Sequence, residues 1–230
     1  MNAIAAMAWD IDGTLVDSEP LHQETLVTVC RRHGFDVETM PADTFLGVHL
    51  HDVWDALHPH LGTAIERDAW IEEITRVYVD RRTELVQQRD ATMVIGELAT
   101  QGLRQVCVSN SGRAIVDANV DSLGIGETIE FSISFDDVAR GKPDPEPYRI
   151  ACERLGLDPW RVAAVEDSAT GAASAKAAGL FVIGFDPTGG MLPGADTTVK
   201  ALADILPLLD RQGRTKAIPT DNKMAGPMGG

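Results

Sequence analysis

The sequence predicts an α/β protein with a Rossmann-like three-layer core, built on a parallel central sheet, and a small all-helical cap domain inserted after the first strand. Two observations support this prediction. Short runs rich in Val, Ile and Phe alternate with helix-like stretches, a rhythm typical of a parallel sheet with helices on both faces. The long segment between the first and second runs is patterned as helix, which indicates an insertion.

The predicted strands are short and apolar. The first ends just before a charged residue, and helix-like stretches separate the later ones. They are Ile4–Trp9, Gln105–Val108, Glu130–Phe135, Arg161–Val165 and Leu180–Phe185.

The inserted segment contains two readable helices. The stretch 21–32 is followed by Gly34, a residue typical of helix C-termini. The sequence TAIE at residues 63–66 has the capping-box pattern and predicts the start of a long helix with apolar residues at helical spacing up to Tyr78. The predicted domains are an α/β core of residues 1–16 and 90–210, a helical cap of residues 17–89 and a flexible tail of residues 211–230.

Two later helices directly follow strands. In GKPDPEPYRIACERLG, Pro145 or Pro147 suits the first helical turn and Gly156 suits the end. In EDSATGAASAKAAG, Gly171 and the alanines permit close packing on the sheet, and Gly179 ends the helix.

Composition restricts the possible partners. The 230 residues carry a formal net charge of −15, which disfavours nucleic acid and anionic membranes, and a phosphorylated small substrate therefore needs a local cationic group or a metal ion. The three cysteines are far apart and show no CxxC spacing, as in reduced cytoplasmic proteins. The N-terminal apolar run is too short for a signal peptide or a membrane span. We expect a cytoplasmic monomer or weak homodimer.

The first predicted strand is followed by two aspartates one residue apart, in the sequence DIDGT. Side chains at i and i+2 of a strand project to the same side, so Asp10 and Asp12 are expected to converge. Such a pair needs a cation, a shared proton or water. Gly13 permits a turn there and Thr14 supplies a hydroxyl. Turn formation after a strand is the structural alternative.

Polar residues also follow the other strands. A Ser-Asn-Ser turn with free backbone N–H groups suits a phosphate, although it is also a common turn. An acidic pair and a lysine have equally ordinary readings as a helix N-cap and a surface charge. All lie at the carboxyl ends of predicted parallel strands, where open α/β sheets bind ligands. They are Ser109, Asn110 and Ser111, then Lys142, then Glu166 and Asp167.

These four motifs, in this order, resemble those of the haloacid dehalogenase superfamily. Within it the chain most resembles the helical-cap phosphatases and the β-phosphoglucomutase-like group, over roughly residues 4–190. The resemblance implies a phosphomonoester hydrolase with an aspartyl-phosphate intermediate, which acts on a small phosphorylated metabolite such as a sugar phosphate or sugar-acid phosphate.

The resemblance also implies residue roles. Asp10 would be the nucleophile and Asp12 the general acid and base. Mg²⁺ would be held by the Asp10 carboxylate, the Asp12 backbone carbonyl, Asp167 and Glu166. The transferring phosphoryl oxygens would bind to Ser109 and Lys142, and Asn110 would assist.

The cap is expected to determine which leaving group the site accepts. His22 falls at a position that resembles a histidine of β-phosphoglucomutase, and the loop at residues 46–52 is a second candidate. The mutase carries an arginine soon after Gly-Val in this loop, whereas this chain has His49 and His51 around Leu50. This difference favours a hydrolase, with a β-phosphoglucomutase-like sugar phosphomutase as the alternative.

Two other classes fit the motifs less well. Hydrolytic dehalogenases of the superfamily lack the second aspartate, and this chain has Asp12. Non-catalytic phospho-receiver modules also gather acids, a hydroxyl and a lysine on a parallel sheet, but they are about half this length and lack the DIDGT pattern.

Overall fold

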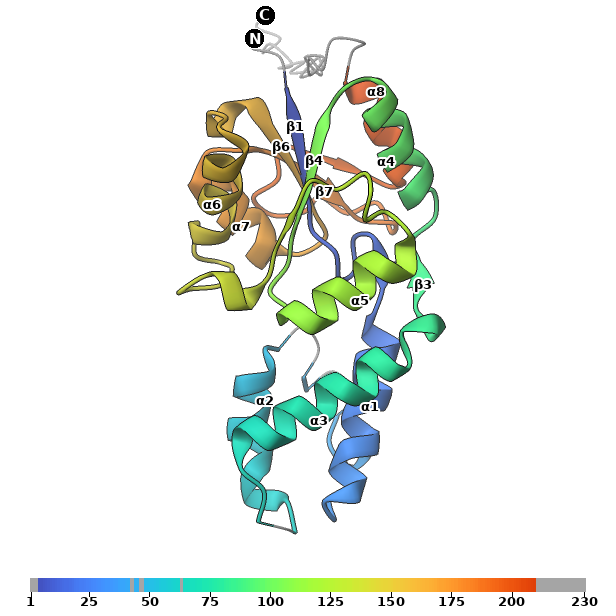
Figure 1. The fold of residues 1–230 in the computed structure, drawn as a ribbon, viewed down its shortest axis with the longest axis vertical. Coiled ribbons are helices and arrows are strands. Elements are labelled where there is room, and N and C mark those ends of the chain that lie inside the picture. The colour runs from blue at the N-terminus through green and yellow to red at the C-terminus, as the bar shows by residue number, and fades with distance from the viewer. Residues whose placement is uncertain (1–3, 42–43, 46–47, 63, 210–230) are drawn as a thin grey trace, which may run out of the picture.

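The computed structural model describes residues 4–41, 44–45, 48–62 and 64–209 and consists of two parts, a core and a cap (Figure 1). The predicted tail at residues 211–230 lies outside the described residues. Among the described residues, no helix is both long and apolar enough to cross a membrane.

The core is built on a six-stranded sheet in the order β5-β4-β1-β6-β7-β8, and every pair of neighbouring strands is parallel. The first strand lies near the middle and is buried along its whole length, as expected for a strand covered on both faces. The strands are β1 (Ala6–Trp9), β4 (Arg104–Val108), β5 (Ser132–Ile133), β6 (Val162–Glu166), β7 (Phe181–Phe185) and β8 (Thr197–Val199).

Two layers of helices bury the two faces of this sheet (Figure 1). Alternate residues of a strand face opposite sides, so Met7 and Trp9 pack on one helical layer while Ala6 and Ala8 pack on the other. The first layer is formed by α4 (Ala91–Thr100), α5 (Arg113–Leu123) and α8 (Ile205–Leu208), and the second by α6 (Glu146–Leu155) and α7 (Ala169–Ala178). The predicted α/β class is confirmed.

The cap has a hydrophobic core of its own. Buried apolar side chains of its three helices, including Val29, Val53 and Trp70, pack together away from the sheet. The helices are α1 (Glu19–Arg32), α2 (Leu50–Leu57) and α3 (Arg67–Asp80). The short strands β2 (Val16–Asp17) and β3 (Val86–Gln87) pair antiparallel where the chain leaves the core and returns to it. We propose these strands as the domain boundaries, close to the predicted limits at residues 17 and 89.

Local details of the prediction need correction. The helix expected to open at Thr63 begins at Arg67, because Glu66 has extended φ and ψ and stands at the N-cap; Thr63 itself lies outside the described residues. The third predicted strand is reduced to two residues, and Phe135 belongs to a short 3-10 helix. The edge strand β8 was not predicted, since its sequence TTV carries little apolar signal.

Candidate active site

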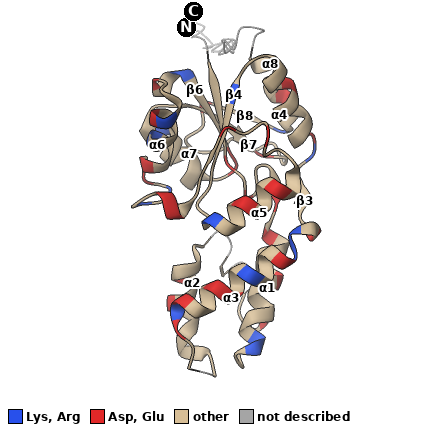
Figure 2. Cartoon of the chain, in the orientation of Figure 1, with Lys and Arg blue, Asp and Glu red and all other residues tan. Residues whose placement is uncertain are grey.

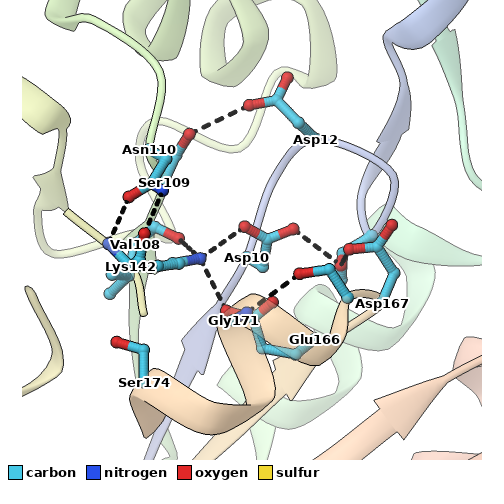
Figure 3. Close-up of polar contacts among 12 residues, drawn as sticks. Asp10, Asp12, Val108, Ser109, Asn110, Lys142, Glu166, Asp167, Gly171 and Ser174 are labelled. Atoms are coloured by element: carbon cyan, nitrogen blue, oxygen red, sulfur yellow. Dashed lines mark hydrogen bonds and ion pairs between the residues drawn. The ribbon is translucent and has the colours of Figure 1, made fainter. Parts of the chain in front are cut away.

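The predicted site residues come together at the carboxyl ends of the parallel strands (Figure 3). The strand β1 ends at Trp9, and Asp10 and Asp12 follow it. The main-chain N–H of Asp10 donates to the carbonyl of Val165 in β6 at 3.0 Å, which continues the pairing of the two strands into the site.

Asp10 is bound by one hydroxyl and one ammonium. Thr14 Oγ1 donates to its Oδ2 at 2.9 Å, and Lys142 Nζ donates to its Oδ1 at 2.7 Å. The aspartate is only 7% exposed. Burial raises the pKa of Asp10, and the Lys142 charge opposes that rise.

Lys142 is almost completely buried and has three acceptors. Besides Asp10, its Nζ donates to the carbonyl of Val108 at 2.8 Å and to Glu166 Oε1 at 2.6 Å. Burial alone lowers the pKa of a lysine, but the two carboxylates outweigh it and hold the pKa of Lys142 above its usual range. The side chain is therefore an ammonium fixed between two acids.

The backbone of Lys142 is held by Asn110. The Lys142 N–H donates to Oδ1 of Asn110 at 2.7 Å, and Nδ2 of Asn110 donates to the Lys142 carbonyl at 3.0 Å. A Cβ at Gly141 would lie 2.7 Å from Oδ1 of Asn110, so glycine is needed beside this contact. Asn110, which was expected to assist phosphoryl binding, therefore positions the loop that carries Lys142.

Three carboxylates form an acidic cluster, which we define as Asp10, Glu166 and Asp167. One oxygen of each lies within 4.8 Å of the others. Oε2 of Glu166 is buried and has no hydrogen-bond partner within the described part of the chain. Burial, reinforced by the Asp10 charge, raises the pKa of Glu166 to about 8 and the pKa of Asp167 to about 7. The single ammonium of Lys142 does not neutralise three acids.

This acidic cluster fits a hard divalent cation. Mg²⁺ prefers carboxylate oxygens as ligands. Burial of a carboxylate oxygen without a hydrogen bond costs free energy unless a cation binds that oxygen. Two positions beside the acidic cluster must be glycine. A Cβ at Gly171 would lie 1.8 Å from Oε2 of Glu166, and a Cβ at Gly13 would lie 2.0 Å from Oδ2 of Asp167. The residues present therefore suit a hard divalent cation.

The Asp12 carboxylate lies outside this cluster. Its Oδ1 accepts from Ser18 Oγ at 2.8 Å and from Asn119 Nδ2 at 3.0 Å, while its Oδ2 accepts from Ser109 Oγ at 3.0 Å and from Ser111 Oγ at 2.8 Å. We call these four donors the Asp12 cage. Figure 3 shows the carboxylate directed toward Ser109.

The expected convergence of Asp10 and Asp12 stays a prediction: the Asp12 charge helps to raise the pKa of Asp10, so the two carboxylates interact, but they bind different partners. The strand ends at Trp9, so the alternation of a strand does not apply to the two aspartates. Among the described residues, the two carboxylates share no hydrogen-bonding partner. The position of the Asp12 carboxylate does not affect the predicted metal contact of this residue, because that contact is made by its backbone carbonyl.

Polar neighbours keep Asp12 ionised. Burial raises the pKa of this carboxyl, but His22, Ser18 and Ser111 outweigh burial and hold the pKa below its usual range. Nε2 of His22, from cap helix α1, lies 3.6 Å from Oδ1 of Asp12. The structure thus brings the predicted cap residue His22 to the acid.

Three contributors to the site were missed in the sequence. The hydroxyl of Tyr148, in α6, donates to Oε1 of Glu166, and its ring centroid lies 5.3 Å from Lys142 Nζ. Asn119 lies in α5, and Tyr78 in cap helix α3 donates to it. The available signal is weak: each is a polar group on a helix face that is otherwise apolar.

The comparison with known proteins agrees with this geometry. The family described as haloacid dehalogenase-like hydrolase matches residues 4–179. The chain belongs to this family. The predicted resemblance and the predicted enzyme class, a haloacid dehalogenase-type phosphatase, are therefore confirmed.

Relatives within the haloacid dehalogenase-like family are similar over most of their length. A phosphoglycolate phosphatase from Cupriavidus necator is 31% identical over 217 residues, which are 89% of this chain and 92% of the relative. A validoxylamine A 7'-phosphate phosphatase from Streptomyces hygroscopicus subsp. limoneus is 29% identical over 211 residues, 86% of this chain and 93% of the relative. The crystal structure of CbbY from Rhodobacter sphaeroides in complex with phosphate has the same fold, with a TM-score of 0.74 at 23% identity over 88% of this chain and 96% of that chain.

Proposed function

We propose that the protein is a Mg²⁺-dependent phosphomonoester hydrolase of a small phosphorylated metabolite, and that it works through an aspartyl phosphate on Asp10. The observation that carries this proposal is the arrangement of Asp10 beside a buried ammonium and two further carboxylates at one edge of the sheet. Family membership supports the same chemistry.

Asp10 is suited to attack phosphorus. Lys142 and Thr14 bind its two oxygens and fix the carboxylate, and an ionised carboxylate can form an acyl phosphate that water later cleaves. In the first step a carboxylate oxygen of Asp10 forms a bond to phosphorus, and the bond between phosphorus and the substrate oxygen breaks. The ammonium of Lys142 and the hydroxyl of Ser109 would bind the oxygens of the transferring group.

Asp12 is the proposed acid and base. It donates a proton to the leaving alkoxide, then accepts one from the water whose oxygen displaces Asp10 from phosphorus, so the enzyme returns to its starting state. The Asp12 cage stabilises the ionised form, which is the base. The same four contacts, from Ser18, Ser109, Ser111 and Asn119, also fix the direction of the Asp12 carboxyl group for proton transfer.

The acidic cluster would hold the magnesium ion, with ligands from Asp10, Asp167 and Glu166. The bound ion supplies positive charge that offsets the repulsion between an anionic substrate and these acids. Such local charge is needed, since the protein carries a net charge of −15 and acidic side chains are spread over both core and cap (Figure 2).

Contacts of the cap and the names of the relatives support the proposed substrate class. His22 lies at the acid, and the ring of His49 at the start of α2 packs on Phe135 of the core, with ring centroids 4.1 Å apart. We infer that the imidazole groups of His22 and His49 favour a leaving group that carries hydroxyls or a carboxylate. The relatives named for phosphoglycolate and validoxylamine A 7'-phosphate support a sugar phosphate or sugar-acid phosphate.

The test is phosphate release across a panel of sugar phosphates, sugar-acid phosphates, phosphoglycolate and nucleotides, with Mg²⁺. We expect turnover of the sugar-type or acid-type compounds and loss of all turnover in Asp10→Asn. Full activity of Asp10→Asn would overturn the assignment of the nucleophile, and isomerisation of a sugar phosphate without net phosphate release would overturn the assignment as a hydrolase.

A further inference from the structure

A buried chain of hydrogen bonds crosses from the cap to Asp12. The hydroxyl of Tyr78, in cap helix α3, donates to Oδ1 of Asn119, in core helix α5, at 2.9 Å. Nδ2 of Asn119 donates to Oδ1 of Asp12 at 3.0 Å. Tyr78 and Asn119 are both fully buried. We call these two side chains the cap relay.

The chemistry of the amide gives this chain a direction. An asparagine side chain has one acceptor oxygen and one donor nitrogen, and exchanging the two would aim the oxygen at a carboxylate. Because the phenol of Tyr78 donates to Oδ1, it fixes the amide in the orientation that presents Nδ2 to Asp12. A cap residue therefore determines which group the core presents to the acid.

The surroundings of Asn119 indicate that its side chain is not buried for packing alone. The buried face of α5 is otherwise apolar, with Ile115, Val116 and Leu123. A polar amide in such a place is costly unless both its donor and its acceptor are satisfied. Within the described residues, the side-chain amide of Asn119 has partners from two distant segments, Tyr78 in the cap and Asp12 in the loop after β1.

A second cap residue, His22, lies close to the same Oδ1 of Asp12. The ring of His22, in α1, stacks on the ring of Tyr78 with centroids 4.4 Å apart, and its Nε2 lies 3.6 Å from Oδ1 of Asp12. Tyr78 therefore contacts two of the three groups that approach this oxygen, Asn119 and His22, and the third is Ser18. Movement of α3 relative to α5 would break the hydrogen bond to Asn119.

We propose that Tyr78 and Asn119 are positioning residues, which orient Asp12 for proton transfer and make its orientation depend on the seating of the cap. The inference rests on the proposed function, in which Asp12 is the acid. It predicts that damage to the cap relay impairs protonation of the leaving group, while binding of the phosphoryl group by Lys142 and Ser109 is preserved.

The test uses the full-length enzyme with Mg²⁺ and two substrates, an alkyl phosphate and an aryl phosphate with an acidic phenol. An alkoxide needs a proton when it leaves, whereas an acidic phenolate hardly does. We expect Tyr78→Phe to slow the single-turnover release of the alcohol by roughly tenfold and the release of the phenol by less than about twofold, with KM changed by less than about twofold. Asn119→Leu should show the same pattern.

Trp70→Phe is the matched control. Trp70 is a fully buried aromatic residue of the same helix, and its indole N–H has no hydrogen-bond partner in the part of the chain that is described. Its replacement disturbs packing of the cap without touching the cap relay. We expect it to leave the ratio of the alkyl and aryl rates unchanged.

The outcomes separate the relay from the proposed function. Asp12→Asn should reduce the alkyl rate far more than the aryl rate, and a uniform loss in that variant would refute the role of Asp12 itself. If Asp12→Asn shows the expected pattern but Tyr78→Phe keeps the wild-type ratio, the cap relay is refuted. Tyr78→Phe retains the ring, so it decides the question even if Asn119→Leu fails to fold.

Discussion

Replacement of Lys142 by Met would leave two buried acids without their common partner. The lysine side chain is 4% exposed, and its ammonium binds Asp10 Oδ1 at 2.7 Å, Glu166 Oε1 at 2.6 Å and the Val108 carbonyl at 2.8 Å. Methionine has a similar length but no positive charge. The substitution therefore isolates the electrostatic contribution of Lys142 to the stability of the fold.

The size of the effect follows from burial. Removal of one partner of a buried ion pair typically destabilises a protein by about 3–5 kcal/mol, because the remaining charge is desolvated and uncompensated. We expect Lys142→Met to lower the free energy of unfolding by about that amount in the absence of metal. Addition of Mg²⁺ should recover part of the loss, since the ion neutralises the same carboxylates.

The assay is urea unfolding at about pH 9, above the pKa of about 8 of Glu166, without divalent metal and with Lys176→Met as the matched control. Lys176 also pairs with an acid, Asp196, but its side chain is 51% exposed, and such surface pairs contribute about 0–1 kcal/mol. A loss below about 1 kcal/mol in Lys142→Met would refute the reasoning. It would mean that the acids are already neutralised without the lysine.

Three more outcomes follow from the acidic cluster. Gly171→Ala should weaken Mg²⁺ binding by at least about tenfold, because the new Cβ would lie 1.8 Å from Oε2 of Glu166; unchanged affinity in calorimetric titration would refute this placement. A chelator should abolish phosphate release and excess Mg²⁺ should restore it, so activity that survives exhaustive chelation would exclude a metal role. Without metal, melting temperature should rise as pH falls from about 9 to about 6. Burial raises the pKa of Glu166 to about 8 and the pKa of Asp167 to about 7, so the folded state gains protons there that the unfolded state does not; the opposite trend would contradict these shifts.

Prediction from the sequence succeeded where the signal is local. The alternation of apolar strands with helices predicts the sheet, and the carboxyl ends of parallel strands meet at one edge whatever lies between them. Asp10, Lys142, Glu166 and Asp167 could therefore be gathered before any coordinates were known. Glycines such as Gly156 and Gly179, which adopt positive φ, also end their helices as expected.

The rest depends on contacts between distant segments. Tyr78 and Asn119 are separated by 41 positions and Asn119 and Asp12 by 107, and the sequence gives no pattern that joins them. The direction of the Asp12 carboxylate could not be predicted either, because it is set by four donors from three separate segments: Ser18, the loop with Ser109 and Ser111, and Asn119. Only the packed cap and core supply that information.

The central claim is that Asp10 carries the phosphoryl group during turnover. The most direct measurement is rapid acid quench of the enzyme after mixing with a substrate labelled in its phosphoryl group and Mg²⁺, followed by peptide mapping. We predict a transient, acid-stable label on the peptide that contains Asp10, formed and lost at rates that account for turnover, and absent from Asp10→Asn. Turnover with no label on that peptide, or with the label on another residue, would contradict the mechanism.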